Sequence, residues 1–304
     1  MSVFEENVSN IRFIAWDTET TGLSPRIDEI VEIGAVAFDE DFEHRVFESL
    51  IRPRMAIPTL VSSIHGITDS MVQDSPTPDV VLPQFVDFLT WSGQPRVLVA
   101  HNASFDVGMV HGEWIRQKTS SGRRGASDLL PSPEICIDSC QLARSLIDDA
   151  PRHSLEALAE YFGISHASKH RAMGDVKVLK EVFLRLLGLA SDRYADANGL
   201  RLERLIMLCG GYYELHTNPA SVSIELIKGA FKFSPALERI SILCGGSSSI
   251  AICYDRDEEW RYVTPIGMKT KNSRVYVEAF CHRDQMKKTF RGDRIRSVGK
   301  VLET

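Results

Sequence analysis

The chain has 304 residues, of which 43% are hydrophobic and 25% are charged, an ordinary composition for a globular protein with room for two domains. It contains no run of about 18 apolar residues, so the sequence predicts no membrane-spanning helix. The N-terminus lacks the basic-then-apolar pattern of a signal peptide, and the six cysteines stand in apolar surroundings. These features argue against a membrane protein and against a secreted disulfide scaffold, and we expect a cytoplasmic protein.

Charge is distributed unevenly along the chain. The net charge is −6, yet residues 261–300 contain 11 Lys and Arg against 3 Asp and Glu, which leaves −14 for the remainder. An acidic net charge argues against a nucleic-acid partner only until this basic segment is considered. The asymmetry indicates two domains with different roles.

The pattern of apolar residues predicts an α/β fold for the first part of the chain. Segments 11–16, 29–38 and 45–51 are rich in β-branched and aromatic residues and are expected to be strands. The following segments predict a helix at 80–91, a strand at 97–100, a helix at 103–116, a surface loop at 119–132, a strand at 135–137, and helices at 139–147, 154–162 and 172–187. Strands followed by alternating helices and strands indicate a mixed sheet flanked by helices.

The later part of the chain changes character after a polar stretch at 191–200. We expect the first domain to span 8–190 and a helical connector to span 191–233, with helices at 202–209 and 221–231. A basic β domain is expected at 234–304. It would begin with a helix and continue with strands at 250–254, 260–265, 275–281 and 288–290, a pattern typical of a small barrel.

The first candidate site follows the strand at 11–16. Side chains alternate between the faces of a strand, so Asp17 and Glu19 project from the same face. Two neighbouring carboxylates at the end of a core strand repel each other unless a cation lies between them, and oxygen ligands suit Mg²⁺ or Mn²⁺. The alternative is an exposed strand end that leads into a turn.

Two later stretches add acidic residues to the prediction. Asp106 lies in the expected first turn of a helix, where the helix dipole favours a carboxylate whether or not it binds a metal. Asp175 is expected on the helix at 172–187, with His170 in the loop before it, because five residues along one helix would place the two on different faces. His166 is the rival histidine.

Together, and in this order, the three stretches resemble the DEDD exonuclease superfamily, in the histidine-containing branch typified by the proofreading subunit of bacterial DNA polymerase III. The spacing of His170 and Asp175, with four residues between them, distinguishes this branch from the tyrosine branch. The same spacing argues against His166. The resemblance covers about 11–187, including landmarks at 29–35, 64–69 and 153–155. It implies a ribonuclease-H-like fold and a bacterial cytoplasmic enzyme that removes nucleotides in the 3′ to 5′ direction.

The resemblance also implies two divalent metal ions, Mg²⁺ or Mn²⁺, and a role for each acidic residue. Asp17, Glu19 and Asp175 would hold the ion that binds the attacking water. Asp17 would bridge to the second ion, and Asp106 would support that ion through water. His170 would accept the proton of the attacking water near neutral pH.

The same resemblance implies contacts to the last nucleotides of a strand. The matching positions are Thr18, Thr20, Thr21, Gly22, Leu23, His65, Asn102 and Phe105. Phe105 matches an aromatic residue that stacks on a base, an interaction that tolerates any sequence. Core packing is the alternative for Leu23 and for Phe105.

The last 70 or so residues are similar to the WYL domain, a small Sm/SH3-like barrel. The similarity rests on Trp260–Pro265 and on the Phe290–Ile295 stretch, although Val275-Tyr276-Val277 stands in place of the naming tripeptide. It implies a basic face for nucleic acid or a nucleotide-like ligand, on which we expect contacts from Arg261, Arg274, Tyr276, Arg291 and Arg294. A solvated surface, or structural ion pairs for some of these arginines, is the alternative.

The leading hypothesis is therefore a two-metal 3′–5′ exonuclease that acts on single-stranded DNA, which the basic domain holds. An RNA- or oligoribonucleotide-trimming enzyme of the same branch is one alternative, since the sequence does not reveal contacts to a 2′-hydroxyl group. A ligand-sensing regulatory module on a nuclease scaffold is another. The oligomeric state and the pathway stay open.

Overall fold

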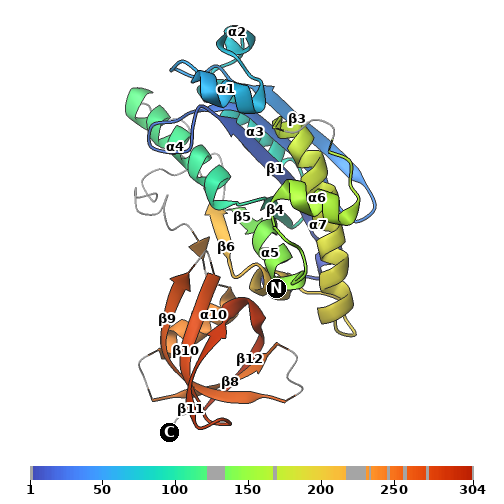
Figure 1. The fold of residues 1–304 in the computed structure, drawn as a ribbon, viewed down its shortest axis with the longest axis vertical. Helices are drawn as coiled ribbons and strands as arrows, with labels where there is room; N and C mark the ends of the chain where they lie inside the picture. The colour runs from blue at the N-terminus through green and yellow to red at the C-terminus, as the bar shows by residue number, and fades with distance from the viewer. Residues whose placement is uncertain are drawn as a thin grey trace.

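The computed structural model describes residues 3–121, 134–166, 170–216, 231–232, 234–244, 247–255, 259–271 and 274–302. These residues form a larger α/β part and a smaller β part (Figure 1). None of the helices in the described ranges has the length and apolar character of a membrane span.

The larger part is built on a seven-stranded mixed sheet with the order β3-β2-β1-β4-β5-β6-β7. Its strands are β1 (Arg12–Thr20), β2 (Ile30–Phe38), β3 (Glu43–Leu50), β4 (Arg96–Ala100), β5 (Glu134–Asp138), β6 (Tyr212–Leu215) and β7 (Phe231–Lys232). Strands β1, β4 and β5 run parallel, and the other pairings are antiparallel.

Helices cover both faces of this sheet, because successive residues of β1 point to opposite sides and both sides are apolar. The helices are α1 (Thr59–His65), α2 (Asp69–Val72), α3 (Pro78–Thr90), α4 (Ser104–Ser121), α5 (Ser139–Leu146), α6 (Leu155–Phe162), α7 (Ala172–Tyr194) and α8 (Leu202–Leu208). Phe13 and Ala15 pack with α5 to α8, whereas Ile14 and Trp16 pack with α3 and α4. This arrangement confirms the predicted α/β fold with a mixed sheet flanked by helices.

The smaller part is an antiparallel sheet with the order β11-β10-β9-β8-β12. It follows α10 (Pro235–Leu243) and comprises β8 (Ser249–Tyr254), β9 (Arg261–Lys271), β10 (Arg274–Cys281), β11 (Met286–Arg291) and β12 (Ile295–Leu302). Its core includes Leu237, Ile240, Val263, Val277 and Phe290. The described pairings do not close this sheet into a ring.

The structure differs from the sequence-based expectation mainly between residues 191 and 233. Helix α7 continues to Tyr194, and β6 and β7 join the main sheet in a range that was expected to be helical. The expected helix at 221–231 lies outside the described residues except for Phe231, which is in β7. Most of the expected loop at 119–132 also lies outside them, and residues 119–121 belong to α4. The domain limits themselves stay predictions.

Candidate active site

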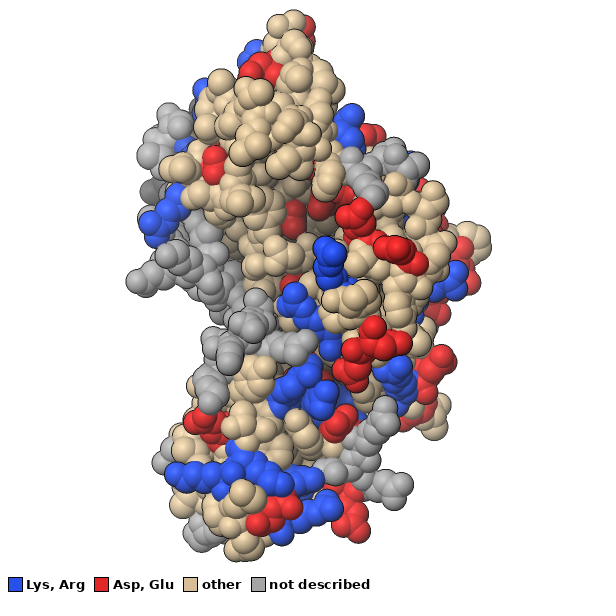
Figure 2. All heavy atoms as spheres, viewed as in Figure 1, with Lys and Arg blue, Asp and Glu red and all other residues tan. Residues whose placement is uncertain are grey.

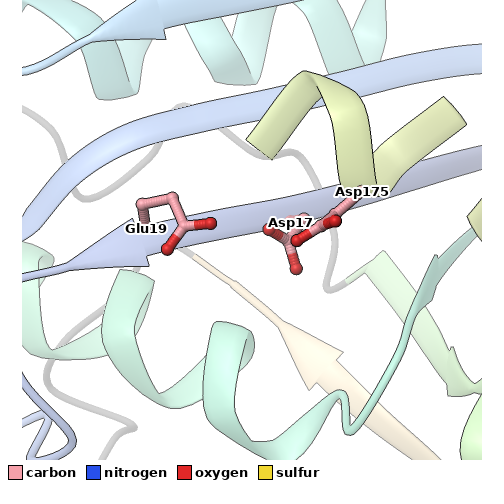
Figure 3. A group of neighbouring side chains, drawn as sticks. All are labelled: Asp17, Glu19 and Asp175. Atoms are coloured by element: carbon pink, nitrogen blue, oxygen red, sulfur yellow. The ribbon is translucent and has the colours of Figure 1, made fainter. Parts of the chain in front are cut away.

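Three carboxylates meet where β1 passes beneath the start of α7. Asp17 and Glu19 extend from β1 and Asp175 from the first turn of α7, and one oxygen from each lies within 4.8 Å of the others (Figure 3). The two β1 residues share a face because they are two apart in a strand. They continue the line of Phe13 and Ala15, the face against which α7 packs.

Asp106 reaches β1 from the opposite layer. The pairing of β1 with β4 ends at Ala15 and Val99, and beyond this point the Thr18 amide donates to Asp106 instead of to a strand. The Thr18 hydroxyl also donates to Asp106, at 2.8 Å, and the carboxylate is buried in the first turn of α4. Asp106 lies outside the group of three mutually close carboxylates, but its charge still acts on Asp17.

Burial and mutual repulsion disfavour ionisation of these acids. Desolvation, followed by repulsion from Asp106, Glu19 and Asp175, raises the pKa of Asp17 well above its usual range. Desolvation, followed by repulsion from Asp175, Glu32 and Asp106, raises the pKa of Glu19 to about 8, and burial raises the pKa of Asp106 to about 7. A cation would relieve this repulsion, and a set of clustered carboxylate oxygens fits a hard divalent ion such as Mg²⁺ or Mn²⁺.

Two histidines lie near Asp175 in different settings. His166 Nε2 is 2.5 Å from Asp175 Oδ1, and its side chain is largely buried. His170 is exposed and has a left-handed backbone (φ 56°) immediately before α7. The spacing in the sequence favours His170 over His166, whereas the structure brings His166 to the carboxylate.

The turn after β1 is held together by its own threonines. The Thr20 hydroxyl donates to the Gly22 carbonyl at 2.6 Å, and the Thr21 amide donates to the Glu29 carbonyl. Leu23 projects from this turn with 85% of its surface exposed, so core packing does not account for it. The side chain of Leu23 is therefore accessible from solvent.

The other residues expected near a nucleotide differ in exposure: His65 is buried, Phe105 is partly buried and Asn102 is exposed. His65 is buried at the end of α1, with its Nε2 3.3 Å from the Thr20 carbonyl oxygen. Asn102 has φ 71°, and its backbone amide donates a hydrogen bond to Asp138. Phe105 is partly buried against the core, so packing accounts for part of its surface.

The basic residues of the smaller part are partly engaged in ion pairs. Arg261 pairs with Asp284 at 2.6 Å. Arg294 lies 3.4 Å from Asp255, and Arg291 pairs with Asp293. Tyr276 is partly buried in β10, and the side chain of Arg274 lies outside the described part of the structure.

Basic side chains nevertheless form patches on the visible face of the molecule, with acidic side chains among them. Figure 2 shows acidic side chains in a hollow of the upper half and patches of Lys and Arg over the lower half, where the smaller sheet lies. The exposed basic residues of the smaller part include Arg283, in the turn between β10 and β11, and Lys287, on β11. A basic surface therefore lies in the same molecule as the acidic site.

Comparison with known proteins places these features in a family. Residues 14–183 match the family model described as Exonuclease (RNase_T), and residues 237–299 match the WYL domain model. A DNA polymerase III PolC-type protein of Caldanaerobacter subterraneus subsp. tengcongensis is 36% identical over 196 residues, which are 63% of this chain and 13% of that protein. The chain thus spans a small fraction of the PolC-type relatives that it matches.

Two further proteins are similar over a larger share of their length. The DNA polymerase III subunit epsilon of Treponema pallidum is 35% identical over 192 residues, which are 62% of this chain and 81% of that subunit. A solved full-length 3′-exonuclease has a TM-score of 0.50 at 17% identity, over 60% of this chain and 62% of that one, which shows a shared fold.

The exonuclease model covers more than half of the chain, and the carboxylates at the end of β1 lie within the matched range. As its motifs predicted, the chain belongs to the exonuclease family, in its DnaQ-like, histidine-containing branch, and carries a WYL domain.

Proposed function

We propose that the protein is a metal-dependent exonuclease that removes nucleotides from the 3′ end of single-stranded DNA. The observation that carries this proposal is the cluster of Asp17, Glu19 and Asp175, whose oxygens lie within 4.8 Å of one another inside an exonuclease fold. Such a cluster is unfavourable without a cation, which supports a catalytic rather than a scaffolding role for this part of the chain.

The acidic residues hold and orient the ions in this proposal. When bound, two divalent ions supply an activated water and stabilise the leaving oxygen of the phosphodiester. Asp17, Glu19 and Asp175 would hold the ion on the water side, and Asp17 would also reach the second. Asp106 is fixed by the Thr18 amide and hydroxyl, so its carboxylate is oriented before any ligand arrives.

His170 would accept the proton of the attacking water on a ring nitrogen. Its exposed position before α7 leaves the imidazole able to move toward the carboxylates when a strand end is bound. His166 is the second candidate because its Nε2 already lies 2.5 Å from Asp175. If His170 is the base, His166 would orient Asp175.

The WYL domain would hold the strand while its end is cut. Exposed basic residues such as Arg283 and Lys287 can contact phosphates without breaking the ion pairs of Arg261, Arg291 and Arg294. We also propose that the five-stranded sheet closes into the small barrel that the WYL resemblance implies. The exposed Leu23 would contact the terminal nucleotide.

The test is degradation of a 5′-labelled single-stranded DNA, beside an RNA of the same sequence, with Mg²⁺, Mn²⁺ or EDTA. We expect a ladder that shortens from the 3′ end, requires metal, and disappears in Asp17→Ala but not in Glu40→Ala, an exposed carboxylate in the β2–β3 turn. Preferential cleavage of the RNA would change the substrate class. Cleavage of neither strand would contradict the nuclease and favour a regulatory module.

A further inference from the structure

Glu32 is a fully buried carboxylate beside the candidate site that the proposed reaction does not use. It lies on β2 directly opposite Glu19 in the antiparallel register, so both side chains point to the face covered by α7. Its oxygens accept hydrogen bonds from Arg171 Nε at 3.1 Å, from Arg171 Nη2 at 2.6 Å and from the Ala172 amide at 2.8 Å. Glu32 therefore holds the beginning of α7.

These contacts replace a cap that the helix does not supply itself. Arg171 occupies the N-cap position of α7, and its side chain makes no capping hydrogen bond. The Glu32 carboxylate satisfies the Ala172 amide from the neighbouring strand and adds negative charge at the positive end of the helix dipole. Asp175 follows one turn later, with its amide bonded to the Arg171 carbonyl.

Gly34 makes a second contact on the same face of β2. It lies directly opposite Asp17 in the register, and a Cβ placed on it would lie 2.9 Å from the Ala172 carbonyl carbon and the Met173 amide nitrogen. Only glycine lets the backbone of α7 approach the strand this closely. The pair Glu32 and Gly34 thus faces the pair Glu19 and Asp17 across the β1–β2 ladder.

We propose that Glu32, Gly34 and Arg171 are positioning residues that fix Asp175 over Asp17 and Glu19 and thereby set the metal affinity of the site. Asp17 and Glu19 are rigid because they lie on a central strand, whereas Asp175 depends on where α7 begins. Glu32 fixes the position of the first turn along β2, and Gly34 fixes its distance from the sheet. This inference rests on the proposed metal-dependent function and adds the residues that make the third carboxylate converge.

The test measures Mn²⁺ binding to the folded protein, by the paramagnetic resonance signal of free Mn²⁺, together with kcat and KM on single-stranded DNA. In Glu32→Gln, Arg171→Met and Gly34→Ala we expect Mn²⁺ affinity to fall about tenfold or more, as it does for outer-shell partners of metal ligands. We expect kcat to fall with it at a fixed Mn²⁺ concentration, while KM for the DNA stays within about threefold, since the strand does not contact these residues in the proposal.

A matched control separates positioning from stability. Lys180 also ties α7 to the sheet, through a 3.0 Å ion pair with Glu43 away from the carboxylates. Lys180→Met is expected to leave Mn²⁺ affinity unchanged. Arg171→Lys keeps the charge but cannot make the bidentate contact with Glu32, so it should fold and show an intermediate loss of Mn²⁺ affinity.

The outcomes distinguish this inference from the proposed function. If the wild type binds Mn²⁺ and cleaves DNA, but Arg171→Lys and Gly34→Ala retain wild-type Mn²⁺ affinity and differ only in melting temperature, positioning is refuted and the nuclease stands. If the wild type does not bind Mn²⁺, both are refuted. Equal losses in Lys180→Met would also refute positioning, because any weakening of α7 would then suffice.

Discussion

Replacing Glu19 by glutamine is expected to stabilise the protein in the absence of metal while abolishing its proposed activity. Desolvation, followed by repulsion from Asp175, Glu32 and Asp106, raises the pKa of the Glu19 carboxyl from 4.5 to about 8. A raised carboxyl pKa means that the folded state holds a proton that the unfolded chain releases. The contribution of the Glu19 carboxyl to the free energy of unfolding is therefore fully present below about pH 4.5 and is lost as the pH rises toward 8.

The size of the effect follows from the width of that pH window. A pH of 7.5 lies roughly three units above the pKa of Glu19 in the unfolded chain. Each unit corresponds to about 1.4 kcal/mol, so the upper limit of the effect on the free energy of unfolding is about 4 kcal/mol. Water screens part of this cost because Glu19 is only partly buried, so we expect a gain of about 2 kcal/mol from Glu19→Gln at pH 7.5. Near pH 4.5 the two proteins should be equally stable.

The assay is urea unfolding in EDTA at pH 4.5 and pH 7.5, followed by tryptophan fluorescence, with Glu40→Gln as the control for removing an exposed carboxylate. Added Mn²⁺ should raise the wild-type midpoint and raise that of Glu19→Gln much less, since one ligand is lost. A variant that is no more stable than the wild type at pH 7.5 would show that the carboxylates are not destabilised by burial and repulsion, and the electrostatic argument for a metal site would fail.

Three further variants test the proposed roles of the histidines and of the basic domain. His170→Ala should lower kcat by about 10² or more with KM little changed, and His166→Ala by less than about tenfold; the reverse order would make His166 the base. Arg283→Gln combined with Lys287→Gln should raise KM for a long strand several-fold and weaken its salt dependence, but leave KM for a dinucleotide unchanged. Equal changes for both substrates would contradict strand holding by the WYL domain.

Local patterns in the sequence are sufficient to predict those strands and helices that do not depend on distant partners. The alternation along β1 was sufficient to put Asp17 and Glu19 on one face, and the helical spacing after Ala172 was sufficient to put Asp175 on a helix. The polar stretch at 191–200 predicts a domain boundary, but α7 extends into it as far as Tyr194. Tertiary packing decides where such a helix ends, since apolar residues of its last turns still face the core.

The elements that were missed depend on partners distant in sequence. Strand β6 has four residues after two glycines and is ordered by pairing with β5, nearly eighty residues earlier. Strand β12 contains Ser297 and Gly299, which weaken its β signal, and it is ordered by pairing with β8. The contact of His166 with Asp175 belongs to the same class, because the residues between them do not follow one periodic pattern.

The contact between Glu32 and Arg171 shows most clearly what a linear pattern cannot reveal. The run that contains Glu32 and Gly34 is apolar on both sides and is accounted for as a buried strand, so nothing in it indicates a buried charge with a partner 139 positions away. The register of β1 and β2 supplies the missing information. A slip of one residue would move Glu32 and Gly34 to the opposite face while Asp17 and Glu19 stayed in place. The start of α7 would then lose both its cap and its close contact, and Asp175 would no longer be held over the other two carboxylates. In this protein the pairing of two strands is thus as much a condition of the site as the four acidic residues.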